Sequence, residues 1–155
     1  MSDDPDTQPK RPHSLGRYLN FATSAVNARC NAILARHDLT LQQWVVLSAL
    51  WQRDNLTVSE IAAYTANAGP AASRIIDRMM ERDLIGRRPD PSDRRASRVF
   101  LTARGERLRH LQTFYDDINA ILLAGLTEQQ ARDLYDLLDH VTQNARNERD
   151  GGSDT

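Results

Sequence analysis

Apolar residues recur at every third or fourth position over most of the chain, which is the spacing of helices with one buried face. A long helix is expected to follow Thr102 and to end near Gly125, which would be its C′ residue. In the helix predicted over residues 70–82, the apolar residues Ile75, Ile76, Met79 and Met80 are expected to face inward. The other predicted helices span residues 14–37, 41–52, 58–66, 70–82 and 128–146.

Several helix starts carry a recognisable capping pattern. A threonine followed three residues later by Gln or Glu can exchange side-chain and backbone hydrogen bonds across the first helical turn. The chain contains this pattern at Thr40–Gln43, Thr57–Glu60 and Thr127–Gln130. A fourth helix start is predicted at Gly69-Pro70, with the glycine as N-cap and the proline as first helical residue.

The helical spacing stops between residues 84 and 101. Leu84-Ile85 and residues 98–101 are short β-type runs, and residues 89–97 between them are rich in Pro, Asp and Ser, which is typical of turns. Three short helices followed by a β-hairpin is the element order of a winged helix-turn-helix. We therefore expect a mainly α fold with a small β-hairpin: a winged helix-turn-helix flanked by N- and C-terminal helices.

Charge is unevenly distributed although the net charge is only −1. Residues 74–109 contain eleven arginines and six acidic residues, whereas residues 128–155 contain three arginines and seven acidic residues. A basic middle segment favours a face that binds an anion such as nucleic acid. A set of solvated helix faces is the alternative, and charge alone does not decide between them.

A more specific pattern follows within the predicted hairpin. Asp93-Arg94-Arg95 forms a D-x-R motif, and after it comes a strand that ends in Leu101-Thr102, followed by Gly105. Together with the helix-turn-helix, this pattern resembles the wing of the MarR family of bacterial transcription regulators, over about residues 40–108. The resemblance implies that Arg95 enters a minor groove and that Asp93 holds or orients arginines around the loop. A narrow A·T-rich minor groove concentrates negative potential, which suits a guanidinium on a loop tip.

The resemblance also implies that the helix over 70–82 contacts base edges in the major groove. The chain departs from the family at Ala71, where a threonine is frequent, and at Asp83, where many members have glycine. Asp83 is expected to keep the turn, because aspartate tolerates the left-handed conformation. The predicted DNA-binding residues are Ser59, Pro70, Ala71, Ser73, Arg74, Arg78, Arg87, Asp93, Arg94, Arg95 and Arg98.

Domain organisation is predicted from the same resemblance. One domain over residues 14–147 would contain dimerisation helices at 14–37 and 103–147 around a winged helix-turn-helix at 40–102, between a disordered arm at 1–13 and a disordered tail at 148–155. Two heptad-like rows are typical of helices that pack together or on a partner chain. They are Leu108, Leu111, Tyr115, Ile118 and Leu122, and then Ala131, Leu134, Leu138, Val141 and Ala145. The expected partners are a second copy of the chain and double-stranded DNA with an inverted-repeat operator.

Many family members bind a small aromatic or anionic effector in a crevice beside the dimer interface. The residues that would line this crevice here are Asn27, Cys30, Trp44, Trp51 and Arg107. For the two tryptophans, core packing is the alternative. Cys30 could instead serve as a redox sensor, but it lies on the apolar row of its helix, and a buried thiol without an activating charge is inert.

Other chemistry is not indicated. The four histidines have no i, i+4 pair, and no G-x-S-x-G motif or P-loop is present, so neither an enzyme nor a cofactor or metal is expected. No apolar run approaches the ~18 residues of a membrane-spanning helix, which favours a cytoplasmic location. The sequence thus predicts a dimeric DNA-binding transcription regulator, specifically a repressor released by a small molecule. The alternatives are a thiol-based redox-responsive regulator using Cys30 and a winged-helix protein–protein interaction module.

Overall fold

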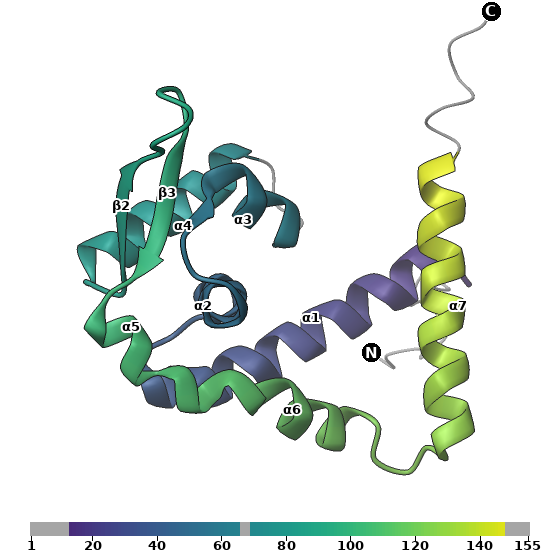
Figure 1. Ribbon diagram of the computed structural model, residues 1–155. Helices are drawn as coiled ribbons and strands as arrows, with labels where there is room; N and C mark the ends of the chain where they lie inside the picture. The colour runs from purple at the N-terminus through teal and green to yellow at the C-terminus, as the bar shows by residue number, and fades with distance from the viewer. Residues whose placement is uncertain (1–12, 66–68, 148–155) are drawn as a thin grey trace, which may run out of the picture. The chain divides into compact units, whose positions relative to one another are not determined.

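The computed structural model describes residues 13–65 and 69–147 (Figure 1), and the chain divides into two compact units between Gln112 and Thr113. Most of the predicted arm, the predicted turn at 66–68 and the predicted tail lie outside the described residues. The first unit contains, in order, α1 (Leu15–Leu34), a 3-10 helix (Ala35–His37), α2 (Leu41–Gln52), β1 (Leu56–Thr57), α3 (Val58–Tyr64), α4 (Gly69–Glu81), β2 (Ile85–Pro89), β3 (Ser97–Leu101) and α5 (Ala103–Arg107). A second 3-10 helix (Arg109–Thr113) leads into the second unit, which contains α6 (Phe114–Leu122) and α7 (Glu128–Asn147).

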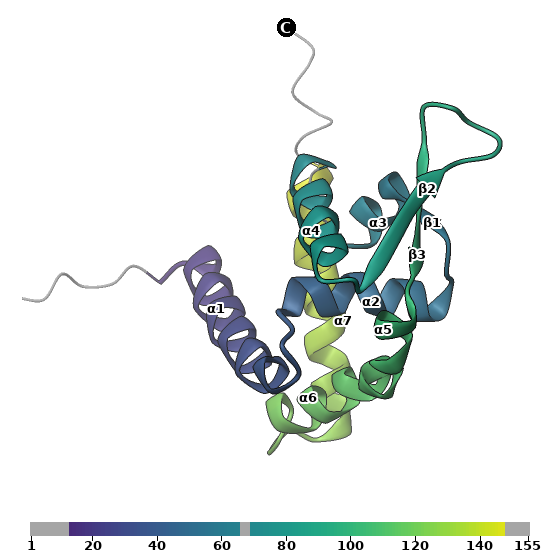
Figure 2. The same ribbon diagram turned by 90° about the vertical axis from the view of Figure 1, so that its left-hand side faces the viewer.

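The predicted fold class is confirmed: α3, α4 and the β2–β3 hairpin form a winged helix-turn-helix. The strands form an antiparallel sheet in the order β1-β3-β2, in which Val99 of β3 pairs with Leu56 on one side and Arg87 on the other. The two-residue strand β1 was not predicted. Figure 2 shows the loop between β2 and β3 projecting beyond the helices of this unit.

Helix α2 is the centre of the first unit. It packs against α1, α3, α4 and β3, and Figure 1 shows it end-on between them. Its two tryptophans are almost fully buried, and their indole N–H groups are bonded to backbone carbonyls: Trp44 Nε1 donates to Leu111 O at 2.9 Å, and Trp51 Nε1 donates to Gly105 O at 3.2 Å. Both side chains are therefore core residues that hold the segment after β3 against α2.

The three predicted capping boxes are confirmed. At the starts of α2, α3 and α7, the threonine hydroxyl accepts from the N–H three residues on, and the Gln or Glu side chain accepts from the threonine N–H. The prediction for α4 was wrong by one residue. The helix already includes Gly69, so Pro70 is its second residue rather than its first.

Helix α4 ends in a left-handed turn at Asp83, as predicted, with φ of 55°. The Asp83 N–H donates to Met80 O and the Leu84 N–H donates to Met79 O, which is the Schellman arrangement. Met80 itself is exposed, contrary to the prediction that it faces inward, because the buried row of α4 runs through Ala72, Ile76 and Met79.

The long helix predicted after Thr102 is not continuous. It is divided into α5, a 3-10 helix and α6, and α6 ends three residues before Gly125. Gly125 is left-handed, with φ of 86°, but it is not the C′ residue as predicted, because the C-cap of α6 is Leu123. Tyr115 and Leu122, predicted on the apolar row, are exposed, whereas Phe114 is buried.

Large apolar side chains remain uncovered on two helices. In α1 the side chains of Leu15, Tyr18 and Phe21 are more than half exposed. In α7 no residue between Glu128 and Asn147 is buried, and Leu134 and Leu138 on the predicted row are 40% and 38% exposed. Such surfaces mark interaction sites in proteins of this size. Among the described residues, none of the helices has the length and apolar character needed to cross a bilayer.

Candidate nucleic-acid interface

The exposed face of α4 is charged and opposite to its buried row. Arg74 and Arg78 lie one turn apart on this face and are exposed, as are Pro70 and Ala71 at the start of the helix. No ion pair with another described residue engages Arg74 or Arg78. Their guanidinium groups are therefore available to a ligand outside the unit.

A polar groove of about 400 Å³ lies between the start of α3, α4 and the wing. It brings together five of the predicted DNA-binding residues, which come from three different elements: Ser59, Ser73, Arg87, Asp93 and Arg95. Hydroxyl and guanidinium groups that converge in this way suit the phosphate oxygens of a nucleic-acid backbone. Arg87 also forms a 3.7 Å ion pair with Asp77 of α4.

The tip of the wing is a turn organised by one buried carboxylate, that of Asp90. Its Oδ1 accepts from Ser92 N at 2.7 Å, from Ser92 Oγ at 2.8 Å and from Asp93 N at 3.2 Å, while its Oδ2 is ion-paired with Arg98 Nε. The N–H and hydroxyl of Ser92, followed by the Arg98 guanidinium, lower the pKa of Asp90 to about 2. The wing turn is therefore held by an ionised carboxylate across the ordinary pH range.

Asp93 contacts the backbone of an arginine rather than a guanidinium group. Asp93 Oδ1 accepts from the backbone N–H of Arg95 at 2.9 Å, so it shapes the turn, and the carboxylate that holds an arginine is Asp90. Asp90 was missing from the predicted site. The signal was available, because an Asp two residues before a Ser in a turn commonly accepts from that backbone N–H.

Arg98 points to the base of the wing. Besides Asp90, it contacts the loop after α2, where its Nη1 donates to Asn55 O at 2.9 Å. Arg88 on β2 donates to Asn55 Oδ1 at 2.8 Å and lies over the Phe100 ring. Because protein groups hold the Arg98 guanidinium, its DNA contact stays a prediction without geometric support, whereas Arg94 and Arg95 are exposed at the tip.

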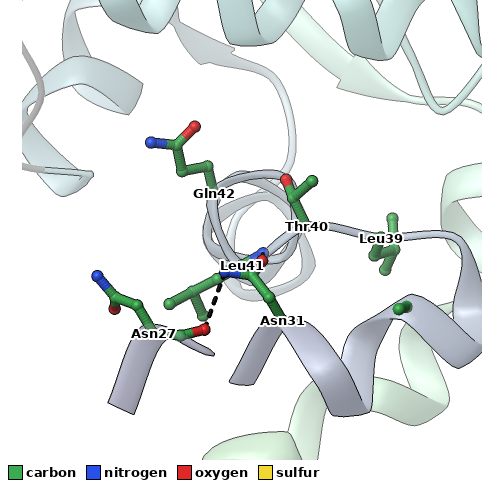
Figure 3. A pocket seen from close by; sticks show the side chains of 7 residues that line it. Asn27, Asn31, Leu39, Thr40, Leu41 and Gln42 are labelled. Carbon is green, nitrogen blue, oxygen red and sulfur yellow. Dashed lines mark hydrogen bonds between the residues drawn. The ribbon is translucent and has the colours of Figure 1, made fainter. Parts of the chain in front are cut away.

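The residues predicted to bind an effector differ in their surroundings. Of the five, Asn27 alone lines the hollow between α1 and the start of α2, which has a volume of about 570 Å³. Figure 3 shows this hollow, in which Asn31 Oδ1 accepts from the Leu41 N–H at 2.8 Å. Trp44 and Trp51 are core residues, and Arg107 is exposed. Burial raises the pKa of the Cys30 thiol.

Within the two described ranges, no three His, Cys, Asp or Glu side chains are grouped closely enough to hold a metal ion.

Comparison with known proteins finds a similar family. The profile of the MarR family matches residues 39–97, which run from the start of α2 into the wing. Over these residues the chain is similar to the MarR family. A MarR-family fold is also found in the crystal structure of a MarR mutant from E. coli bound to operator DNA, which is 26% identical, with a TM-score of 0.76, over 82% of this chain and 92% of that one.

Two curated relatives extend this comparison. The uncharacterized HTH-type transcriptional regulator YsmB of Bacillus subtilis is 30% identical over 90 residues, which cover 58% of this chain. The match spans 62% of YsmB, so it leaves more than a third of that relative uncovered. The HTH-type transcriptional repressor IacR of Pseudomonas putida is 28% identical over 113 residues, which cover 72% of this chain and 68% of IacR.

Proposed function

We propose that this chain is a sequence-specific DNA-binding transcription regulator of the MarR family that acts as a homodimer on an inverted-repeat operator. The observation that carries the proposal is the groove in which Ser73 of α4 and Arg95 of the wing lie beside the start of α3. One unit thereby presents a recognition helix and a basic loop tip together. The solved complex of E. coli MarR with operator DNA supports the same use of this fold.

The predicted site residues other than Arg98 divide into four roles under this proposal. Pro70, Ala71, Ser73, Arg74 and Arg78 on α4 face the major groove, where arginine side chains bind guanine edges. Arg94 and Arg95 enter the flanking minor groove. Ser59 and Arg87 contact phosphates, and Asp93 shapes the turn that presents Arg95.

The homodimer accounts for the uncovered apolar side chains. Residues of α1 and α7 that are about 40% to 60% exposed in one chain become buried when a second copy covers them. Obligate homodimer interfaces are apolar in this way. The helices predicted for dimerisation, residues 14–37 and 103–147 flanking the winged helix-turn-helix, retain that role in the proposal.

Repression released by a small effector is the finer part of the proposal. The name of IacR, a repressor, supports the first half. For the second half, the hollow beside Asn27 supplies amide groups and the Thr40 hydroxyl for a small polar or anionic molecule. We do not extend the proposal to a redox switch, because the Cys30 thiol is buried and its pKa is raised, which disfavours the reactive thiolate.

The test of this function compares two arginines of the proposed site. Duplexes selected from a random pool by the purified protein define a preferred sequence. Replacing Arg74 with alanine should cost ~1–3 kcal/mol on this sequence and much less on random DNA, as expected for a base contact. Replacing Arg95 with alanine should weaken binding to duplexes with A·T-rich flanks. The slope of log K against log salt should fall by the amount that corresponds to about one phosphate contact per wing.

Selection without enrichment of any sequence would contradict the proposed function. Equal loss on preferred and random DNA for Arg74→Ala would instead assign Arg74 to phosphate contact. Unchanged affinity and salt dependence for Arg95→Ala would mean that the wing does not touch DNA. Ala103→Ser is a suitable control, since residue 103 begins α5, outside the proposed interface.

A further inference from the structure

The wing tip depends on polar contacts rather than on apolar packing. Residues 91–95 are all exposed, so no buried side chain anchors this segment. At the two ends of the loop, Asp90 is buried and Ser97 begins β3. The position of Arg94 and Arg95 relative to α4 therefore follows from the hydrogen bonds that close the turn.

The two oxygens of Asp90 have separate functions. Oδ1 accepts three hydrogen bonds from Ser92 and Asp93 and so closes the turn. Oδ2 is paired with Arg98, which extends from the opposite strand. The Asp90 carboxylate therefore both closes the turn and attaches it to strand β3.

A second set of contacts joins the base of the wing to the loop after α2. Asn55 has a left-handed backbone, with φ of 64°, and its two oxygens accept from arginines of both wing strands, Arg98 and Arg88. Its neighbour Asp54 accepts from the Leu101 N–H at 2.9 Å. We call Asp90, Arg98, Asn55 and Arg88 the wing buttress.

We propose that the wing buttress sets the DNA specificity of the wing without touching DNA: Asp90, through Arg98 and Asn55, fixes the direction in which Arg95 enters the flanking groove. This inference rests on the proposed function. A loop that is ordered before binding loses less conformational entropy on binding, and its guanidinium arrives at one position rather than many. Arg88 and Arg98 are then positioning residues, and Arg94 and Arg95 at the tip contact DNA.

The substitution Asp90→Asn separates the two functions of the carboxylate. An asparagine oxygen can still accept from Ser92 and Asp93, but its amide nitrogen faces the Arg98 guanidinium, which is also a donor. The turn is thereby kept and the link to Arg98 is lost. Asp116→Asn in α6 is the matched control, because it removes the same charge from an exposed position in the other unit.

The measurement is the ratio of affinities for two duplexes that share the selected half-sites and carry either A·T-rich or G·C-rich flanks. For Asp90→Asn we expect the ratio to fall by about tenfold, which is the effect of losing one charge-assisted hydrogen bond. If the wild-type ratio is itself below about tenfold, the ratio should fall to unity. The salt dependence should match that of Asp116→Asn, because Arg95 keeps its charge. Arg98→Ala should lower the ratio similarly, and the double variant should lower it no further.

A readout without DNA uses amide hydrogen exchange of Ser92 and Asp93. Exchange should stay slow in Asp90→Asn, where the turn acceptor remains, and should become fast in Asp90→Ala. Asn55→Gly keeps the left-handed backbone and the acceptor for Arg98 but removes the acceptor for Arg88. We expect it to lower the flank ratio by less than Asp90→Asn does.

Two results would overturn the inference. An unchanged flank ratio in both Asp90→Asn and Arg98→Ala would show that the buttress does not set specificity. Tighter binding of Asp90→Asn to both duplexes, with a steeper salt dependence, would show that Asp90 masks Arg98 as a direct DNA contact. Failure of the proposed function is distinct, because the wild-type protein would then select no sequence at all.

Discussion

At the scale of single residues, the tightest backbone approach involves Gly105 in α5. A methyl group added to its Cα would lie 2.1 Å from the carbonyl oxygen of Leu84, which is backbone and cannot move aside. We expect Gly105→Ala to destabilise the protein by roughly 1–3 kcal/mol, the usual range for overpacking. Urea unfolding followed by circular dichroism measures the change.

A second glycine gives the matched control. In Gly16, near the start of α1, the nearest atom to an added Cβ is Ser14 Oγ at 3.9 Å, an ordinary contact. Because alanine is a better helix former than glycine by ~0.5–1 kcal/mol, Gly16→Ala should be neutral or stabilising. Equal effects of the two substitutions would contradict the steric argument at Gly105.

The lowered pKa of Asp90 predicts how the stability of the protein changes with acidification. Its pKa is lowered to about 2 from an ordinary 3.8, so its ionised form is favoured by folding. The stability it contributes is complete above the ordinary pKa and is lost as pH falls through about 2. The difference in unfolding free energy between wild type and Asp90→Ala should therefore be constant near neutral pH and narrow below about pH 4. A difference that grows on acidification would refute this account.

The residues that sequence analysis assigned correctly act through local chemistry. The capping threonines and Asp83 bond within a few positions of themselves, so their spacing is sufficient. Asp90 and Asp93 lie in the same turn, but only Asp93 belongs to the D-x-R motif. The choice between them depends on which carboxylate faces Arg98 across the hairpin, and that requires the strand register.

At the scale of elements, the break between α5 and α6 matches the spacing of two side chains of α2. Trp44 and Trp51 are seven residues apart, about 10.5 Å along the α2 axis, and they bond Leu111 and Gly105, which are six residues apart. A continuous α-helix would separate these two by only about 9 Å, and the greater rise of a 3-10 turn makes up the difference. The spacing of apolar residues over 103–125 does not reveal the distance between the two tryptophans, so it predicts one continuous helix.

The strand β1 was missed for a related reason. Its two residues, Leu56 and Thr57, form only two pairs with β3, and Thr57 is also the N-cap of α3. A two-residue strand has no alternating pattern to detect. Its existence depends on Arg98 and Val99 of a distant segment.

Helix α7 gives a prediction for assembly. Leu134 lies on the uncovered apolar row, and a charge there would be desolvated in a dimer, so Leu134→Glu should shift the protein toward monomer. Sedimentation velocity at micromolar concentration measures the shift. Gln143→Glu adds the same charge about 180° away on the helix and should leave the dimer intact. A wild-type protein that sediments as a monomer would contradict the proposed assembly.

At the scale of the whole molecule, two chains related by a two-fold axis require a symmetric DNA site. The selected sequence should contain an inverted repeat with half-sites about one helical turn apart, ~34 Å. Moving one half-site by about five base pairs places it on the opposite face of the duplex, and binding should then fall to that of a single half-site. Gel-shift titration of the two duplexes decides the matter, and equal affinity for both would exclude symmetric binding.

The placement of the two tryptophans has a practical consequence for spectroscopy. They are the chain's only tryptophans, both belong to α2, and both indole groups are bonded to the segment between Gly105 and Leu111. The intrinsic emission of the protein therefore reports whether that segment remains on α2, independently of the wing. A red shift during heating or on adding a small molecule would mark release of the segment, so this protein carries its own fluorescent probe at the end of the winged helix.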